Sequence, residues 1–527
     1  MTNILRTYKI CTLALVVGMI PASVGAQQAA APAGQQPGPV VAPYTVGQAI
    51  PEVAPGTAMV PLTLEQAMDI ALEKNLALRA ARLAPQMADY QLASARAAFL
   101  PQLTGTYTYN DATQLTNDII DQGVSSFNNR AQQFNSGASL QTPWYGGRAN
   151  LSFNNNRAVT TNPRTIFNPT FTSNLQFNYV QPLLRGMAID DTRNQIRTLP
   201  IQRQVADLQL LSQIENTKAS VRTAYWNLRA AIEQIEIQRR SLVLAQRLFQ
   251  DNLTKVEIGT LAQIETTTSE TQVANAEQAL LNAQIQWRTA ELALKQLLAE
   301  GPEDPIYGNT INPVETAALS VQSVDIPSAV QRALADRSDL VQARRNLEVS
   351  NLSLEVTNNQ TKPQLDLQGG YTSRGQNRLE GSTVTGYGAA VNQLFAFDVP
   401  TWNVQLNFTY PLFMRAAKAN FARARLQVQQ AETQIKAQEL TVSTEVTNAG
   451  YAVENTFKQF QAAQKAREAA ERNAEAEQIR FEVGMSTNYN VVQAQTNLTT
   501  QRLAELRAII SYLNAVAEFE RVQRVGR

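Results

Sequence analysis

The feature that most constrains the fold is the segment at residues 403–412, which reads NVQLNFTYPL. Polar and apolar side chains alternate along it: Asn403, Gln405, Asn407 and Thr409 alternate with Val404, Leu406, Phe408 and Tyr410. Successive side chains of a β-strand point to opposite faces, so this alternation predicts a strand with one polar and one apolar face. A related segment, LQFNYVQPLL, occupies residues 175–184, and both segments precede long runs rich in Ala, Gln, Glu and Arg that predict helices. The fold therefore combines two-faced strands with long helices.

The chain repeats this plan. AMDIALEKNLAL at residues 67–78 aligns with AVQRALADRSDL at residues 329–340. Further matches pair Pro101 with Pro363, Pro182 with Pro411, and Gly259 with Gly484. Each copy then reads helix, strand, long polar loop, strand, long helix, glycine turn and helix, which indicates an internal duplication.

We expect a first structural repeat over residues 62–300 and a second over residues 327–525, joined by a linker at residues 301–326. The expected elements of the first repeat are a helix at 62–98, a strand at 102–110, a loop at 111–173, a strand at 174–181 and helices at 185–258 and 260–298. Those of the second are a helix at 327–361, a strand at 364–372, a loop to 401, a strand at 402–410 and helices at 412–483 and 485–525. At 1.5 Å per residue each long helix spans roughly 110 Å, so the two shorter helices of a repeat, stacked end to end, would match it. Apolar residues recur at the three- and four-residue spacing of a coiled coil, as at Val221, Tyr225, Leu228, Ile232 and Ile235.

The N-terminal residues are expected to lie outside this plan. Arg6 and Lys9 precede an apolar run and a stretch of small residues ending at Ala26, which is the arrangement of a cleaved signal peptide at residues 1–26. Cys11 lies in the middle of the apolar run, where a lipid-modified cysteine is not expected. Residues 27–60, rich in Ala, Pro, Gln and Gly, predict a flexible tail.

The composition excludes most catalytic chemistry. The chain contains no His and one Cys, which argues against thiol nucleophiles, disulfides, Ser-His-Asp triads and the usual zinc sites. The acidic pairs Asp190-Asp191 and Glu303-Asp304 stand at a helix start and in the linker, where capping and solvation account for them. A formal net charge of +1 gives no case for nucleic-acid binding. We therefore expect no enzymatic activity, no cofactor, no metal and no nucleic-acid partner.

The strands predict an oligomer. A strand of ~9–11 residues with one apolar face is the size that crosses a bilayer obliquely, whereas no mature segment reaches the ~20 apolar residues of a spanning helix. Four such strands cannot close, and an open sheet edge cannot face lipid because its N–H and C=O groups would lack partners. Three chains with twelve strands would satisfy these groups. A half-buried sheet in a water-soluble protein is the alternative.

The duplicated layout, YVQPLLRG at residues 179–186, PQL before each first strand and the two glycine turns together resemble the TolC family of outer-membrane efflux proteins. The resemblance implies a mainly helical homotrimer with membrane β-structure. A twelve-stranded barrel, four strands per chain, would cross the outer membrane of a Gram-negative bacterium and contact its lipid. A long α-helical coiled-coil barrel would continue into the periplasm, with the linker in its equatorial region.

The resemblance also implies function and partners. The trimer would be the exit duct of a tripartite efflux or type I secretion system and would conduct substrates passively. Its partners would be a periplasmic adaptor, also called a membrane fusion protein, and an inner-membrane pump of the RND, ABC or MFS type. The cargo, whether drug, metal ion, polysaccharide or protein, is left open.

Site residues follow from the same resemblance. In the family, a Val-Gly-Leu or Val-Gly-Thr motif at the two helix turns docks the adaptor; the matching residues are Ile258, Gly259, Thr260, Val483, Gly484 and Met485. The positions that match the family's pore gate hold Glu265, Phe481, Ser486, Asn490 and Gln493. Phe481 replaces a tyrosine, Ser486 an arginine, and the last two replace aspartates. Closure is therefore expected to rest on packing, or on pairing of Glu265 with Lys255 or Arg480.

Two rival hypotheses come from other classes. A filament or surface protein built from helical hairpins, such as a flagellin-like subunit, would also be poor in cysteine, but it would lack the duplication and the signal peptide. A periplasmic carboxylate enzyme would need a compact cleft, which this layout does not offer.

Overall fold

The computed structural model describes residues 49–52, 58–115, 126–162, 164–315, 324–377, 379–380 and 383–523. The expected signal peptide at residues 1–26 lies outside the described residues, as does most of the expected tail. The tail does not extend to residue 60, because Ala49 is 7% exposed and strand β1 (Met59–Leu62) begins within it.

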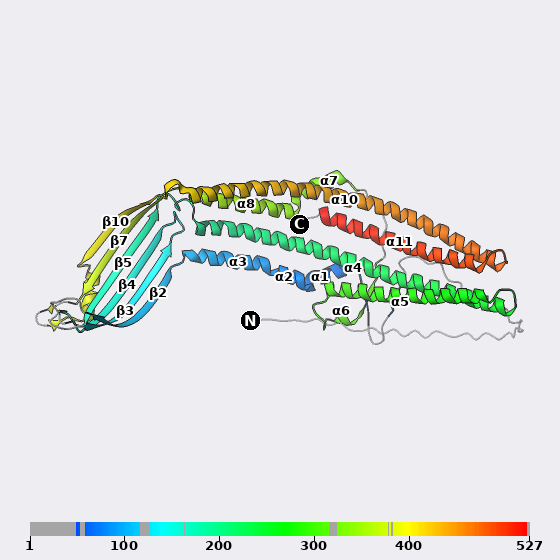
Figure 1. The fold of residues 1–527 in the computed structure, drawn as a ribbon, viewed down its shortest axis with the longest axis horizontal. Helices are drawn as coiled ribbons and strands as arrows, with labels where there is room; N and C mark the ends of the chain where they lie inside the picture. The colour runs from blue at the N-terminus through cyan, green and yellow to red at the C-terminus, as the bar shows by residue number, and fades with distance from the viewer. Residues whose placement is uncertain are drawn as a thin grey trace, which may run out of the picture. The chain divides into compact units, whose positions relative to one another are not determined.

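Two long helices organise the fold, α4 (Asp191–Glu257) and α10 (Arg415–Glu482), of 67 and 68 residues (Figure 1). Each is followed by a glycine turn and a shorter helix that packs along it, α5 (Ile264–Leu298) or α11 (Asn488–Gln523). The helices that precede the strands also pack on α4 and α10. They are α1 (Leu64–Lys74), α2 (Leu76–Ala81) and α3 (Leu83–Arg96) in the first repeat, and α7 (Ile326–Asp336) and α8 (Ser338–Asn359) in the second. Of the helices described, none is both long enough and apolar enough to cross a membrane.

Local polar groups set where these helices begin and end. The helix expected over residues 62–98 is divided, because the side chain of Asn75 accepts a hydrogen bond from the Leu78 N–H (3.0 Å) and starts a new helix. The long helix expected from residue 185 begins only at Asp191, because Asp190 caps it by accepting from the Arg193 N–H (2.8 Å). The short helices η1 (Ala97–Phe99) and η2 (Leu412–Met414) lie where helix meets strand.

The main sheet has six antiparallel strands in the order β10-β7-β5-β4-β3-β2 (Figure 1). They are β2 (Gln102–Leu115), β3 (Ser126–Gln141), β4 (Arg148–Thr160), β5 (Thr170–Pro182), β7 (Gln364–Gln376) and β10 (Pro400–Thr409). The loop expected at residues 111–173 contains strands β3 and β4, a possibility that the sequence left open. The sheet therefore has six strands, and the expected count of four strands per chain was wrong. Strands β3 and β4 are rich in Asn, Gln and Ser and carry a weak apolar alternation, so only their pairing between β2 and β5 defines them.

One face of this sheet is apolar across all six strands. A single row of paired residues crosses the whole sheet: Leu103, Ala138, Leu151, Phe177, Tyr371 and Trp402. The adjacent row on the opposite face is polar: Gln102, Ser139, Asn150, Asn178, Gly370 and Asn403. The apolar face is open, since Leu103 is 83% exposed and Trp402 75% exposed. Strands β3 and β4 therefore continue both faces of the sheet, with the alternation that is typical of membrane-spanning strands.

The largest core lies where the N-terminal segment meets the linker. Strand β1 pairs in parallel with β6 (Thr310–Pro313), which follows the short helix α6 (Pro305–Gly308). Tyr225 of α4 is buried there and donates its hydroxyl hydrogen to the Leu62 carbonyl (3.0 Å). Arg229, also buried, pairs with Glu233 (2.9 Å). The linker is thus bound to the middle of the first repeat.

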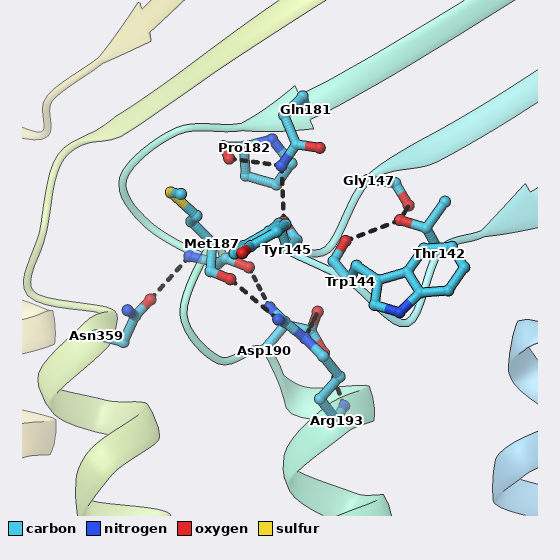
Figure 2. A network of polar contacts seen from close by, with 11 residues as sticks. Thr142, Trp144, Tyr145, Gly147, Gln181, Pro182, Met187, Asp190, Arg193 and Asn359 are labelled. Carbon is cyan, nitrogen blue, oxygen red and sulfur yellow. Dashed lines mark hydrogen bonds and ion pairs between the residues drawn. The ribbon is translucent and has the colours of Figure 1, made fainter.

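A polar network joins the sheet to the helices, at the turn between β3 and β4 (Figure 2). The Gln181 amide donates to the Tyr145 carbonyl (2.8 Å), which ties this turn to the end of β5. Arg193 of α4 donates to the Asp190 carboxylate (2.9 Å) and to the Met187 carbonyl (3.0 Å). The Gly186 N–H donates to Asn359 Oδ1 of α8 (2.8 Å), which links the two repeats.

Gly146 lies at the centre of this junction. Its φ of +71° falls in the left-handed region, where a side chain is disfavoured. A Cβ at this position would lie 2.7 Å from the Gly186 carbonyl oxygen and 3.1 Å from Asp190 Oδ2. The turn therefore packs against the start of α4 only because residue 146 has no side chain.

We predict that Gly146→Ala lowers the free energy of unfolding by about 1–3 kcal/mol, through backbone strain and displacement of the turn. The measurement is thermal or denaturant unfolding in detergent, followed by circular dichroism. Gly105→Ala in β2 is the matched control, because no atom lies within 4 Å of a Cβ there. Equal stability of the two variants would contradict the role given to Gly146 in packing the turn against α4.

Candidate functional site

The predicted docking residues form two matching helix ends. At the end of α4, Gly259 has a φ of +76° and donates its N–H to the Val256 carbonyl (2.9 Å), while the Thr260 N–H donates to the Lys255 carbonyl (2.9 Å). At the end of α10, Gly484 has a φ of +77°, its N–H donates to the Phe481 carbonyl (3.2 Å), and the Met485 N–H donates to the Arg480 carbonyl (2.7 Å). This pair of bonds defines a Schellman motif, which requires a left-handed residue after the helix. The left-handed backbone conformation explains why both positions hold glycine.

Both turns present apolar side chains to solvent. Ile258 is 68% exposed, Val483 65% and Met485 78%. No atom lies within 4 Å of a Cβ built on Gly259 or Gly484, so the turns themselves are uncovered in one chain. Exposed apolar residues gathered at two turns are a feature of protein interaction sites.

A buried polar chain connects three helices near these turns. The Asn252 amide of α4 donates to Asn488 Oδ1 of α11 (2.9 Å), and the Asn488 amide donates to Glu265 Oε2 of α5 (3.0 Å). Asn252 is fully buried and Asn488 is 1% exposed. Because buried amides need hydrogen-bond partners, these two hydrogen bonds fix α11 against the α4–α5 hairpin.

Phe481 packs beside this polar chain. It is 6% exposed and contacts Leu248 of α4 and Val491 of α11 in one apolar cluster. The ammonium group of Lys255 lies 3.7 Å from the centre of its ring, a cation–π contact. The phenylalanine at this position thus joins the two hairpins by packing.

Ser486 takes part in a third contact, at the other turn. Its hydroxyl donates to Glu477 Oε2 (2.7 Å), and Arg480 pairs with Glu477 Oε1 (2.7 Å). The Ser486 hydrogen bond first, and then the hydrogen bond and charge of Arg480, lower the pKa of Glu477 below its ordinary value. A lowered carboxyl pKa means that these contacts are present at neutral pH and are lost as the pH falls through the folded-state pKa. Asn490 donates to the Ser486 hydroxyl (3.4 Å).

The structure separates the expected gate residues into distinct roles. Closure was expected to rest on packing, or on pairing of Glu265 with Lys255 or Arg480. The pairing is absent among these residues: Glu265 accepts from Asn488, Lys255 lies over Phe481, and Arg480 pairs with Glu477. Gln493, by contrast, is exposed on α11.

Sequence reasoning missed three residues of the site, namely Asn252, Asn488 and Glu477. The available signal was spacing: Asn252 follows Leu248 by four residues and Asn488 precedes Val491 by three, so each amide occupies an apolar helix face. In the described part of the chain, no group of three or more His, Cys, Asp or Glu residues is placed to hold a metal ion.

Comparisons with known proteins bear on this arrangement. A family model described as outer membrane efflux protein matches residues 67–155, 145–300 and 329–522. A search of curated proteins finds no significant match.

Several solved structures share the fold. The CmeC outer membrane channel of Campylobacter jejuni superposes with a TM-score of 0.65 at 17% identity, covering 87% of this chain and 85% of that one. VceC of Vibrio cholerae gives a TM-score of 0.63 at 14% identity, with 88% and 96% covered. The open-state MtrE channel of Neisseria gonorrhoeae gives 0.60 at 18% identity, with 93% and 97% covered.

The family model spans most of both repeats, including the six-stranded sheet and the two glycine turns. The chain belongs to the outer membrane efflux protein family.

Proposed function

We propose that three copies of this outer-membrane exit duct close into one channel, with eighteen strands in the membrane. The observation that carries the proposal is the six-stranded sheet, which has one exposed apolar face and two edges, β2 and β10. Unpaired edge groups are not tolerated in lipid, so β2 of one copy must pair with β10 of the next. Three such sheets give eighteen strands in place of the expected twelve.

The dimensions of strands and helices favour this number. Each chain supplies four helical columns, namely α4, α10 and the shorter helices packed along each. Twelve columns about 10 Å apart have a circumference of roughly 120 Å. Eighteen strands about 4.8 Å apart and tilted by about 40° close at roughly 110 Å, whereas twelve close at roughly 75 Å. The added hairpin β3–β4 thus matches the membrane barrel to the helical barrel.

The duct works with two partners in this proposal. A periplasmic adaptor would cover the turns at Ile258, Val483 and Met485, and an inner-membrane pump of the RND, ABC or MFS type would supply the energy. The same arrangement would serve a tripartite efflux system or a type I secretion system. The exposed apolar turns support adaptor docking, because such side chains gain free energy when a partner removes them from water.

Closure of the duct rests on contacts within one chain. The amide chain Asn252–Asn488–Glu265 and the packing of Phe481 hold the α10–α11 hairpin against the α4–α5 hairpin. Opening would require these hairpins to separate at the turns. The proposed gate therefore depends on buried neutral amides and an aromatic ring, with Glu265 as acceptor.

The assembly is tested by native mass spectrometry of the mature protein in detergent, together with single-channel recording in planar bilayers. We expect a mass of three chains and discrete conductance steps. A monomer that remains soluble without detergent and forms no channels would overturn the proposal.

Docking at the turns predicts that Ile258→Asp abolishes binding of the adaptor, because a charge would replace a desolvated apolar contact. The measurement is binding of the purified adaptor to the reconstituted channel. Ile258→Leu is the matched control and should bind as the wild type does. Equal binding of the Asp variant would remove this turn from the interface.

If these contacts hold the duct closed, Glu265→Ala should raise the single-channel conductance. Losing the acceptor leaves the buried Asn488 amide without its carboxylate partner, a loss of about 1–3 kcal/mol to the closed arrangement. Glu265→Gln retains an acceptor oxygen and should conduct like the wild type. An unchanged conductance in the Ala variant would exclude Glu265 from the gate.

A further inference from the structure

The connection between β7 and β10 contains a helix that lies on the sheet, α9 (Tyr387–Ala396), together with the short pair β8 (Leu379–Glu380) and β9 (Thr383–Val384). Helix α9 packs on β7 and β5, with Ala390 and Leu394 fully buried. Gly375 of β7 allows this approach, because a Cβ there would overlap the Ala390 carbonyl oxygen. Tyr371, Ser373 and Gly375 are two residues apart and therefore share the apolar face of β7. Helix α9 thus covers the apolar face and not the polar one.

The underside of α9 is hydrogen-bonded to the sheet. The Ser373 hydroxyl donates to the Leu394 carbonyl (2.7 Å). The Tyr387 hydroxyl donates to Asn155 Oδ1 of β4 (2.9 Å), which also accepts from the Ser173 hydroxyl (2.8 Å). Ser173, Ser373 and Asn155 are all buried. At this end of the strands the apolar face carries polar groups, and α9 covers them.

The outward side of the same segment is apolar. Phe395 is 58% exposed, Phe397 47% and Val399 46%. The Phe397 ring lies 6.0 Å from that of Tyr371, and the segment continues into β10 at the exposed Trp402. Residues 386–397 contain no Asp, Glu, Lys or Arg, and the exposed Asp398 follows them. The exposed surface of α9 therefore extends the apolar surface of the sheet.

The position of α9 along the strands indicates which part of the membrane surrounds it. Strand β7 starts at Gln364, next to the helices, and ends at Gln376, so α9 lies at the end of the sheet remote from the helices. In an outer membrane protein whose helices reach the periplasm, that end faces the outer leaflet. A helix can enter lipid because its backbone groups are paired internally, and α9 carries no charged side chain that would oppose this.

We propose that residues 387–397 form a membrane anchor on the outside of the barrel, with Phe395 and Phe397 inserted among the acyl chains of the outer leaflet and the exposed Asp398 at the level of the headgroups. The absence of basic side chains from residues 386–397 favours acyl chains over headgroup phosphates as the contact. Helix α9 lies over β7 and β5, whereas neighbouring chains join at β2 and β10, which favours lipid over a second copy. The inference rests on the outer-membrane location and is independent of the adaptor and the gate.

The test uses single-cysteine variants, because the sequence carries only Cys11, within the expected signal peptide. Phe395→Cys is labelled with nitrobenzoxadiazole, and the full assembly is reconstituted in vesicles of phosphatidylethanolamine and phosphatidylglycerol. Quenching is compared for lipids with a nitroxide on the acyl chain, lipids with a nitroxide on the headgroup, and aqueous iodide. Leu406→Cys, on the apolar face of β10, and Gln405→Cys, on its polar face, are the matched controls.

We expect the Phe395 label to behave like the Leu406 label, with blue-shifted emission, strong quenching by acyl-chain nitroxide and loss of iodide quenching. Iodide quenching like that at Gln405, quenching by headgroup nitroxide alone, or shielding from all three quenchers by a neighbouring chain would each overturn the anchor. Failure at Leu406 as well would instead show that the sheet is not in the bilayer. The two proposals can therefore fail separately.

Discussion

The backbone groups at the edges of a sheet cannot remain unpaired in lipid, and this constraint governs the rest of the structure. Strands β2 and β10 each have a neighbour on one side only, while their exposed side chains favour lipid. A single chain is therefore incomplete as a membrane structure. Joining β2 to β10 between copies, as proposed, would pair both edges at once, and it would also determine how many helical columns stand below the barrel.

The two halves of the chain share an order of helices and strands, and they differ in the connection between their first and last strands of the sheet. Between its two expected strands, the first repeat inserts the hairpin β3–β4, whereas the second inserts α9. The hairpin extends the sheet sideways, because its register continues the apolar and polar rows. The helix instead covers one end of the apolar face. Both additions carry exposed apolar side chains, such as Phe134 and Leu151 on the hairpin and Phe395 on α9.

The helix turns show how a contact can be held without buried ion pairs. Removing charged groups from water costs much free energy, whereas burying amides that hydrogen-bond to each other costs less. Asn252 and Asn488 are buried together, and Glu265, the only carboxylate among these three hydrogen-bonded side chains, is half-buried. Phe481 adds apolar packing in the same place. The hairpins are thus held by groups whose contacts can break without leaving a fully buried charge.

Sequence alone determined the features that depend on local periodicity and backbone geometry. Alternation at residues 403–410, prolines at the strand ends, long helical runs and a glycine at each Schellman turn are all visible without a structure. Only the tertiary structure decided the features that depend on neighbours. Strands β3 and β4 are too polar to be recognised until β2 and β5 pair with them, and α9 needs Gly375 beneath it. Asn488 is a site residue only because folding brings Asn252 and Glu265, distant in sequence, within hydrogen-bonding distance of one side chain.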